Sequence, residues 1–321
     1  MKLIIQIPCY NEENSLPITL RELPRKVKGF DTVEWLIIDD GSTDKTVEVA
    51  KKLGVDHIVK LTKNQGLSKA FPAGLEACLQ LGADVIVNTD ADNQYNAGDI
   101  PELVKPILDG KADIVIGARP IPEIKHFSII KKILQKLGSY VVKKVSKTDI
   151  PDAPSGFRAF SKKAAMQLQV FNSYTYTLET IIQAGRLNMA IISVPIRVNE
   201  DLRPSRLVKS IPDYIKRSII TIFRIFIIYE PFKFFITIGL SLFLFGLLIG
   251  IRFLYYFFTG DGEGHIQSLI LSSILMIIGF QTMLIAFIAD LISVNRRLLE
   301  DILFRLKKMD YNTTKRQQKT K

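Results

Sequence analysis

Short apolar runs alternate with amphipathic stretches through the first two thirds of the chain. The runs predict strands at residues 3–7, 35–38, 57–61, 84–88 and 114–116. Between them, residues 42–54 and 67–81 repeat apolar positions at helical spacing, with Pro72 acceptable only in the first turn of its helix. Apolar strands separated by amphipathic helices predict an α/β fold, with a mostly parallel sheet covered on both faces.

The last third has a different pattern. Residues 234–251 carry no charge, the run extends to residue 258 if Arg252 is tolerated, and residues 266–289 form a second uncharged run. About 20 apolar residues span a bilayer as a helix, and soluble helices rarely stay apolar on every face for so long. We therefore predict two transmembrane helices, at about 232–258 and 266–290.

These patterns divide the chain into four parts. We expect a cytosolic catalytic domain at 1–210, an amphipathic interfacial helix at 211–231, the transmembrane hairpin at 232–292 and a basic cytosolic segment at 293–321. The loop at 259–265 has two acids and no Lys or Arg, whereas the outer flanks are basic, so both termini should be cytosolic. The N-terminus has no signal-peptide pattern. The tail from residue 305 should be loosely ordered and attracted to anionic lipid.

Charge and composition narrow the class of partner. The chain has 43 Lys and Arg against 32 Asp and Glu, a net charge of +11, which favours a polyanionic partner. With two predicted spans, anionic lipid or a phosphorylated ligand is a better match than nucleic acid, and no basic face with aromatic residues stands out. Cys9 and Cys78 are too few for a disulfide framework or a four-cysteine zinc site, and the three histidines are scattered.

Acidic residues follow two of the predicted strands. Asp39 and Asp40 come after the second strand, and Asp90 and Asp92 come after the fourth. Ligands of parallel sheets bind beyond the carboxyl ends of the strands, although Asp is also common in turns and caps. The run Asp90-Ala91-Asp92-Asn93-Gln94 offers two carboxylates and an amide oxygen, which suit Mg²⁺ or Mn²⁺. No P-loop or Gly-x-Gly-x-x-Gly motif is present, so a metal held by side chains is the remaining way to bind phosphates.

Three motifs together resemble a known family. Residues 8–12 (PCYNE), 38–44 (IDDGSTD) and 90–94 (DADNQ) are similar, in this order and spacing, to family 2 glycosyltransferases with the GT-A fold. Residues 152–158 (DAPSGFR) and the two spans resemble the polyprenyl/dolichyl-phosphate branch, of which dolichyl-phosphate mannose synthase is the best-known type. The resemblance implies a membrane-bound inverting transferase, which moves a hexose from a GDP-mannose or UDP-glucose type of donor to polyprenyl or dolichyl phosphate.

The resemblance also implies roles for individual residues. The expected contacts of the nucleotide sugar are Pro8, Tyr10, Glu12, Ile38, Asp39, Asp40, Asp90, Ala91, Asp92, Gln94 and Arg119. Asp40 is expected to touch the nucleotide rather than Asp39. The metal ligands would be Asp90, Asp92 and Gln94, and the catalytic group would be Asp90, Asp92, Arg119 and Asp152. Asp152 is either a base, a group that positions the acceptor, or a turn residue. The acceptor phosphate would meet Arg158, Arg203, Arg206 and Lys209, although the last three also fit a solvated basic linker.

Two other functions compete with this interpretation. A processive polysaccharide synthase is expected to carry a Gln-x-x-Arg-Trp signature, which is absent because Trp35 is the only tryptophan. A non-catalytic membrane tether that binds nucleotides would not need complete acidic clusters. The donor sugar, the nucleotide base, the isoprenoid and any homo-oligomer stay open.

Overall fold

The computed structural model describes residues 1–120, 138–140, 142–143, 146, 148–170, 176–200, 220, 223–224, 227–260 and 262–319, with the side chains of 263, 310 and 312–319 left aside. The chain forms two compact units. The first comprises Met1–Ser218 with Asp301–Lys321, and the second is Ile219–Glu300. Most of the expected interfacial helix at 211–231 lies outside the described residues, so it stays a prediction.

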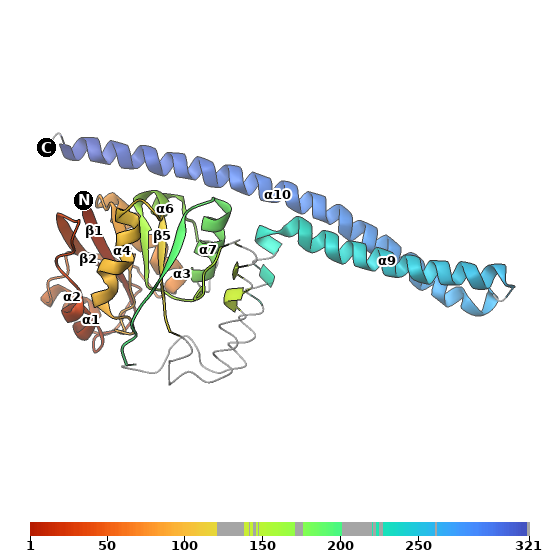
Figure 1. Cartoon of the computed structure of the whole chain (residues 1–321), viewed down its shortest axis with the longest axis horizontal. Coiled ribbons are helices and arrows are strands. Elements are labelled where there is room, and N and C mark those ends of the chain that lie inside the picture. Colours follow the sequence, from red (N-terminus) through yellow and green to blue (C-terminus); the bar gives the residue numbers. More distant parts are fainter. Residues whose placement is uncertain are drawn as a thin grey trace. The chain divides into compact units, whose positions relative to one another are not determined.

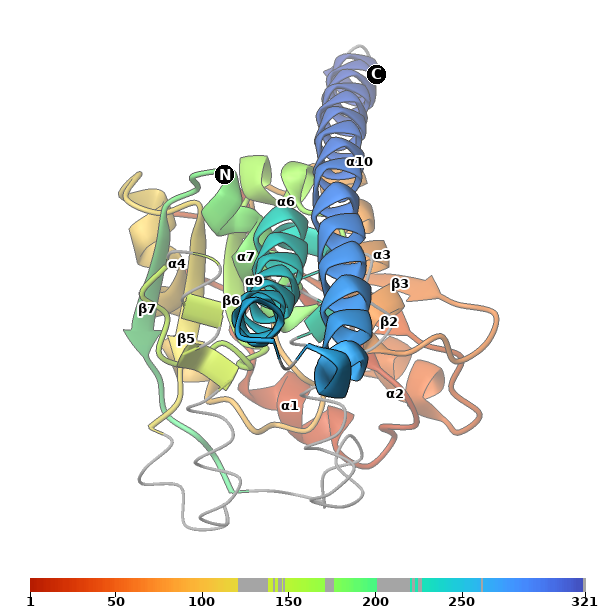
Figure 2. The same cartoon turned by 90° about the vertical axis from the view of Figure 1, so that its right-hand side faces the viewer.

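A seven-stranded sheet forms the centre of the first unit. Its strands are β1 (Lys2–Cys9), β2 (Thr32–Asp39), β3 (His57–Lys60), β4 (Val85–Asn88), β5 (Ile114–Ala118), β6 (Arg158–Ser161) and β7 (Ile191–Pro195). Their order is β3-β2-β1-β4-β6-β5-β7, and only β6 runs antiparallel, between β4 and β5 (Figure 2). The mostly parallel α/β sheet is therefore confirmed.

Helices cover both faces of this sheet (Figure 1). They are α1 (Leu16–Glu22), α2 (Thr46–Lys52), α3 (Leu67–Gln80), α4 (Ile100–Leu108), α6 (Lys162–Gln167) and α7 (Thr177–Arg186), with a short 3₁₀ turn η1 (Ala97–Asp99) before α4. Alternate residues of a strand point to opposite faces, so Leu3, Ile5 and Ile7 of β1 share one core with α1 and α4. The opposite face of β1 and β2 packs against α3. Pro72 lies inside α3, not in its first turn as expected.

Gly74 sets how closely α3 approaches the sheet. A Cβ atom at this position would lie 2.5 Å from Gln6 Oε1 and 2.7 Å from Ile38 Cδ1. We expect Gly74→Ala to lower stability by about 1–3 kcal/mol, because overpacking outweighs the better helix propensity of Ala. Thermal unfolding in detergent measures the effect. The control is Gly138→Ala, because no described atom lies within 4 Å of the Cβ position there. Equal melting temperatures for the two variants would contradict this account of the packing.

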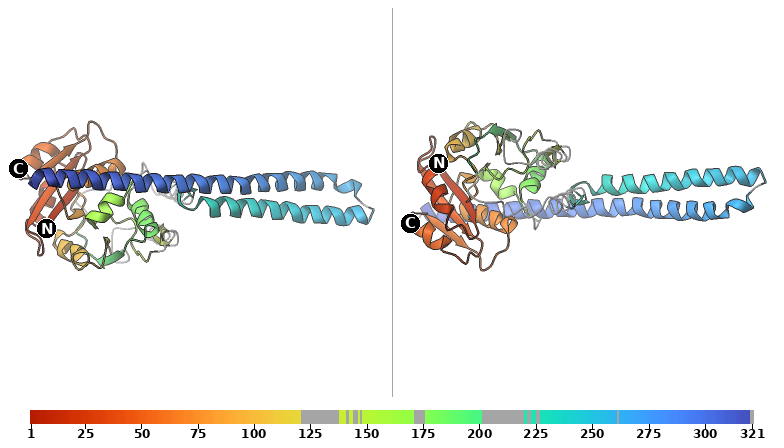
Figure 3. Two further views of the ribbon diagram at one scale, coloured as in Figure 1. Left: turned by 90° about the horizontal axis from the view of Figure 1, so that it is seen from above. Right: turned by 90° about the horizontal axis from the view of Figure 1, so that it is seen from below.

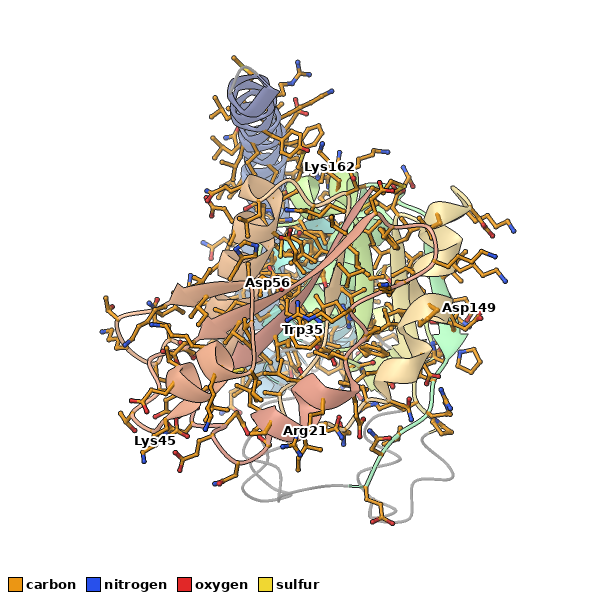
Figure 4. All side chains as sticks on the ribbon, turned by 90° about the vertical axis from the view of Figure 1, so that its left-hand side faces the viewer. Arg21, Trp35, Lys45, Asp56, Asp149 and Lys162 are labelled. Carbon is orange, nitrogen blue, oxygen red and sulfur yellow. The ribbon has the colours of Figure 1, made fainter. Side chains whose placement is uncertain are left out.

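Trp35, the only tryptophan, makes contacts that hold strand β2 in place. The guanidinium of Arg25 lies over the ring of Trp35 at 3.4 Å, and the backbone N–H of Trp35 donates to Asp56 Oδ2 at 2.7 Å (Figure 4). Trp35 Nε1–H donates to the Pro24 carbonyl. These contacts fasten β2 to the segments on either side of it, at the amino end of the strand.

Two long helices form the second unit, the second of them up to Glu300. They are α9 (Pro231–Phe258) and α10 (Ile266–Lys319), with a 3₁₀ turn η3 (Glu263–His265) between them. Their most apolar windows have mean hydropathies of 2.5 and 2.2 and are only 11% and 17% buried. Core helices of soluble proteins are mostly buried, so helices of this length and exposure are suited to cross a membrane. The basic tail, expected to be loosely ordered, is instead a continuation of α10 to Lys319.

Small residues bring the two helices together within this unit. The helices run side by side (Figure 3), and a Cβ on Gly239 of α9 would lie 2.8 Å from the Gly279 carbonyl of α10. Ser272 Oγ donates to the Gly246 carbonyl at 2.7 Å. In lipid, where apolar surface gives no net drive for association, close backbone approach and such hydrogen bonds hold helices together.

Candidate active site

The two acids after β2 differ in what they bind. Asp39 is fully buried, and its Oδ1 accepts the Ser42 N–H at 2.9 Å, but its Oδ2 has no hydrogen-bond partner among the described residues. Asp40 uses both oxygens, which accept the backbone N–H groups of Gln65 and Gly66 at 2.8 Å each. These bonds argue against Asp40 as the direct nucleotide contact, because its acceptors already have donors. An unpaired buried carboxylate oxygen is costly, so Asp39 is the better acceptor for a donor group of a ligand.

The loops after β1 and β2 are joined by hydrogen bonds. The backbone N–H of Asn11 donates to Ser42 Oγ at 2.9 Å, and that of Glu12 donates to Thr46 Oγ1 at 2.8 Å. The carboxylate of Glu12 is buried and accepts the Ser15 hydroxyl. Pro8 and Ile38 lie side by side in the register of β1 and β2, and the ring of Tyr10 is 38% exposed just beyond them. The expected nucleotide contacts of these two loops are therefore neighbours.

Carboxylates from three loops lie around the buried thiol of Cys9. Burial raises the pKa of Cys9 well above its usual value, and the negative charges of Glu12, Asp39, Asp44 and Asp90 raise it further. Cys9 therefore stays a neutral thiol. The same charges show that the acids after β1, β2 and β4 converge at the carboxyl edge of the sheet, as the parallel arrangement predicts.

The turn after β4 presents Asp90 and Asp92 at this edge. The carbonyl of Ala91 accepts the hydroxyl of Thr19 from α1 at 3.0 Å, which anchors the turn between the two acids. Asp92 Oδ1 accepts the Gln94 N–H at 3.2 Å. The Asp90 carboxylate lies against Gly156, where an added Cβ would be 3.2 Å from Oδ2 and 3.3 Å from Oδ1. A side chain at Gly156 would press on this carboxylate.

Arg119 and Asp152 form a buried ion pair. Arg119 Nε and Nη2 donate to Asp152 Oδ2 and Oδ1 at 2.8 and 3.0 Å, and the Arg119 backbone N–H adds a third bond at 3.1 Å. The side chains are 7% and 1% exposed. Both oxygens of Asp152 therefore accept bonds from Arg119, which fits a group that fixes the guanidinium and argues against a free base. Burial lowers the pKa of Arg119, but Tyr95, the ion pair with Asp152 and the negative charge of Asp90 together raise it above its usual value.

A buried hydrogen-bond network positions Gly156. The sequence analysis did not predict it. Tyr95 Oη accepts the Gly156 N–H at 2.9 Å, and Asn88 Nδ2 donates to the Gly156 carbonyl and to Tyr176 Oη, both at 2.9 Å. Gln6 Nε2 donates to Asn88 Oδ1 across β1 and β4 at 2.9 Å. Burial and the nearby charge of Asp90 raise the pKa of both phenols, so they stay protonated. The sequence did contain a signal for this network, because Gln6 and Asn88 are amides in otherwise apolar strands.

The burial of Arg158 points to a structural role and argues against its expected role at the acceptor phosphate. The side chain is 0% exposed. Its donors bond to the carbonyls of Ala153, Ser155 and Thr177 and to the hydroxyl of Thr180, at 2.7 to 2.8 Å. Burial lowers the pKa of Arg158 to about 10. A guanidinium with these bonds joins the 152–158 segment to the start of α7 and presents nothing to a ligand.

The expected metal-binding residues can hold a divalent cation only if a bound phosphate and water complete its coordination. The described residues contain no group of three or more His, Cys, Asp or Glu that could hold a metal. Asp90 and Asp92 supply two carboxylates, and Gln94 an amide, from one turn; all are oxygen donors, which suit Mg²⁺ or Mn²⁺. The remaining ligands would come from phosphate oxygens and water. Arg203, Arg206 and Lys209 lie outside the described residues.

Comparisons with known proteins agree with this arrangement. The family model described as "Glycosyl transferase family 2" matches residues 4–169. The chain is 30% identical over 218 residues to the undecaprenyl-phosphate mannosyltransferase of Micrococcus luteus, covering 64% of this chain and 88% of that protein. It is 30% identical over 213 residues to the UDP-N-acetylglucosamine–dolichyl-phosphate N-acetylglucosaminyltransferase of Methanococcus voltae, covering 60% and 83%.

A solved structure supports the fold. The glucosyl-3-phosphoglycerate synthase of Mycobacterium tuberculosis, crystallised with Mn²⁺, UDP and glucosyl-3-phosphoglycerate, superposes with a TM-score of 0.53 at 18% identity. The match covers 70% of this chain and 78% of that one. Because the family model covers more than half of the chain and the acids converge as its motifs imply, the chain belongs to glycosyl transferase family 2 and is a glycosyltransferase.

Proposed function

We propose that the protein transfers a hexose from a nucleotide sugar to polyprenyl or dolichyl phosphate, with inversion at the anomeric carbon. The observation that carries the proposal is the site itself, where the Asp90 carboxylate lies against Gly156 and interacts electrostatically with Arg119 of the Arg119–Asp152 pair, in a chain with two apolar helices. The names of the two relatives support a lipid-phosphate acceptor. The membrane is the proposed location, with the catalytic unit and both termini on the cytosolic side.

The donor half of the site would hold a nucleoside diphosphate. An ionised Asp39 Oδ2 can accept a hydrogen bond, for example from the ring N–H of uracil or guanine in a UDP or GDP type of donor. Asp90 and Asp92, with Gln94, would hold a divalent cation. Such a cation, when bound, neutralises charge on a departing diphosphate. Arg119, kept in place by Asp152, adds a fixed positive charge beside the same phosphates.

The acceptor half requires little proton transfer. A phosphate monoester has a second pKa near 6, so the acceptor is mostly a dianion at neutral pH and can attack without a base. This agrees with the occupied oxygens of Asp152. The work left to the protein is alignment of the phosphate oxygen with the anomeric carbon, opposite the leaving diphosphate. Arg203, Arg206 and Lys209 are proposed for the acceptor on the family resemblance. A direct displacement of this kind inverts the anomeric configuration.

A transfer assay tests the proposal. The purified full chain in detergent is mixed with Mg²⁺ or Mn²⁺, polyprenyl phosphate and one of three radiolabelled donors, GDP-mannose, UDP-glucose or UDP-N-acetylglucosamine. We expect label in the organic phase with one donor, abolished by EDTA, and a product whose NMR coupling constants show inversion. Label in a water-soluble polymer would support a processive synthase instead. No transfer from any donor by folded protein would contradict the proposal.

A further inference from the structure

The chain that follows β7 crosses the turn that carries the acids. We call residues 196–199 the strap. Tyr95 and Val198 form an isolated antiparallel bridge, and the Asn96 N–H donates to the Arg197 carbonyl at 3.4 Å. At the amino end of the strap, the Arg197 guanidinium and backbone N–H bind the Asp99 carboxylate at 2.6 to 2.9 Å. The strap thus lies along residues 93–99, which follow Asp92 and include the proposed ligand Gln94.

Asn199 makes the contacts nearest to those ligands. Its backbone N–H donates to the Gln94 carbonyl at 2.9 Å, and its Nδ2 donates to the Asn93 carbonyl at 3.0 Å. Nδ2 also reaches Glu22 Oε2 at 3.3 Å, and Oδ1 accepts Asn96 Nδ2 at 3.3 Å. The Asn199 side chain therefore contacts Asn93 next to Asp92, Asn96 just before η1, and Glu22 at the end of α1.

The backbone at Asn93 explains why such a hold is needed. Its φ is +56°, in the left-handed region that residues other than Gly rarely adopt. Non-Gly residues in this conformation cost free energy and persist where surrounding contacts hold them. Here the left-handed residue stands between Asp92 and Gln94, so the conformation of Asn93 decides how the two side chains are placed relative to each other. The Asn199 bonds to the carbonyls of Asn93 and Gln94 fasten the backbone on the carboxyl side of this residue.

We propose that Asn199 is a positioning residue that holds Asp92 and Gln94 in the arrangement that binds a divalent cation. The inference rests on the proposed function, because it assumes that this turn is the metal site. It assigns to the strap a role beyond joining β7 to the rest of the chain. Asn199 does not touch the cation itself, since its side-chain amide is used on Asn93, Glu22 and Asn96.

The experiment measures metal binding apart from transfer. Free Mn²⁺ is followed by electron paramagnetic resonance as the full chain is titrated with Mn²⁺ in the presence of UDP or of GDP. We expect Asn199→Ala to weaken Mn²⁺ binding about fivefold, the value of one hydrogen bond net of solvation. In the transfer assay the same variant should need more metal but approach the native rate once the metal is saturating. The melting temperature without metal is measured beside it, because bound metal also stabilises a weakened fold. A native melting temperature there assigns the loss to metal binding.

The matched control is Arg197→Ala. It removes the guanidinium bonds of the other anchor of the strap, on Asp99, and leaves the Asn93 and Gln94 contacts in place. We expect its Mn²⁺ affinity to stay within about twofold of the native value, whatever the change in melting temperature. Native Mn²⁺ affinity in Asn199→Ala, or an equal loss in both variants, would overturn the inference. A native chain that binds no Mn²⁺ with either nucleotide would instead overturn the metal site of the proposed function, so the two failures are distinguishable.

Discussion

Asp92→Asn is expected to lower kcat/KM for sugar transfer at least about 100-fold, while the melting temperature stays native. The substitution removes one negative charge from the turn but keeps an oxygen at the Oδ1 position. That oxygen accepts the Gln94 N–H, so the turn can form as before. What is lost is a charged ligand for the cation that neutralises the leaving diphosphate. The measurement is initial transfer rate against donor concentration at several Mn²⁺ concentrations.

The control for this variant is Asp109→Asn. It also removes one carboxylate charge, but from the exposed end of α4, where Lys111 at 3.3 Å is the ion-pair partner of Asp109 among the described residues. Exposed pairs of this kind contribute little, so transfer and stability should both stay native. If Asp92→Asn kept more than half of the native rate at every metal concentration, Asp92 would not be a metal ligand. If Asp109→Asn lost as much as Asp92→Asn, the effect would come from net charge.

The sheet was largely predictable because burial on both faces makes parallel strands continuously apolar. The run Leu3 to Ile7 and the run Val85 to Asn88 are detectable for this reason. β6 was missed because it has four residues, begins with Arg158 and runs antiparallel between β4 and β5. Its place depends on contacts between segments more than 40 residues apart in sequence, which no local pattern records.

The site was predictable in its location but not in its bonding. Parallel strands bring their carboxyl ends to one edge, so the acids after β2 and β4 had to be neighbours. Which acid still has an open acceptor depends on where loop amides point. Asp40 binds the amides of Gln65 and Gly66, contributed by a loop about 25 positions further along the chain, and Asp39 keeps the open oxygen. A motif places residue types at a site, whereas the roles of its members follow from hydrogen bonds that form only in the folded chain.

The same reasoning applies most strongly to Arg158, and it gives the second large effect. Arg158→Leu should lower the free energy of unfolding by about 3–5 kcal/mol. Leucine fills much of the space, but the carbonyls of Ala153, Ser155 and Thr177 lose their donor while buried. For a unit of this size the melting temperature should fall by about 10 °C. Thermal unfolding in detergent, followed by near-ultraviolet circular dichroism, measures it.

Two further variants decide between the structural role and a role at the acceptor phosphate. Arg21→Leu makes the same chemical change on the exposed side of α1 and should leave the melting temperature native (Figure 4). Arg158→Lys keeps the charge but offers fewer donors in a different geometry, so it should melt between the native chain and Arg158→Leu. A phosphate ligand behaves in another way, because its loss raises the KM for polyprenyl phosphate without unfolding the protein. A native melting temperature for Arg158→Leu, together with a raised KM for the lipid, would therefore show that Arg158 binds the acceptor phosphate.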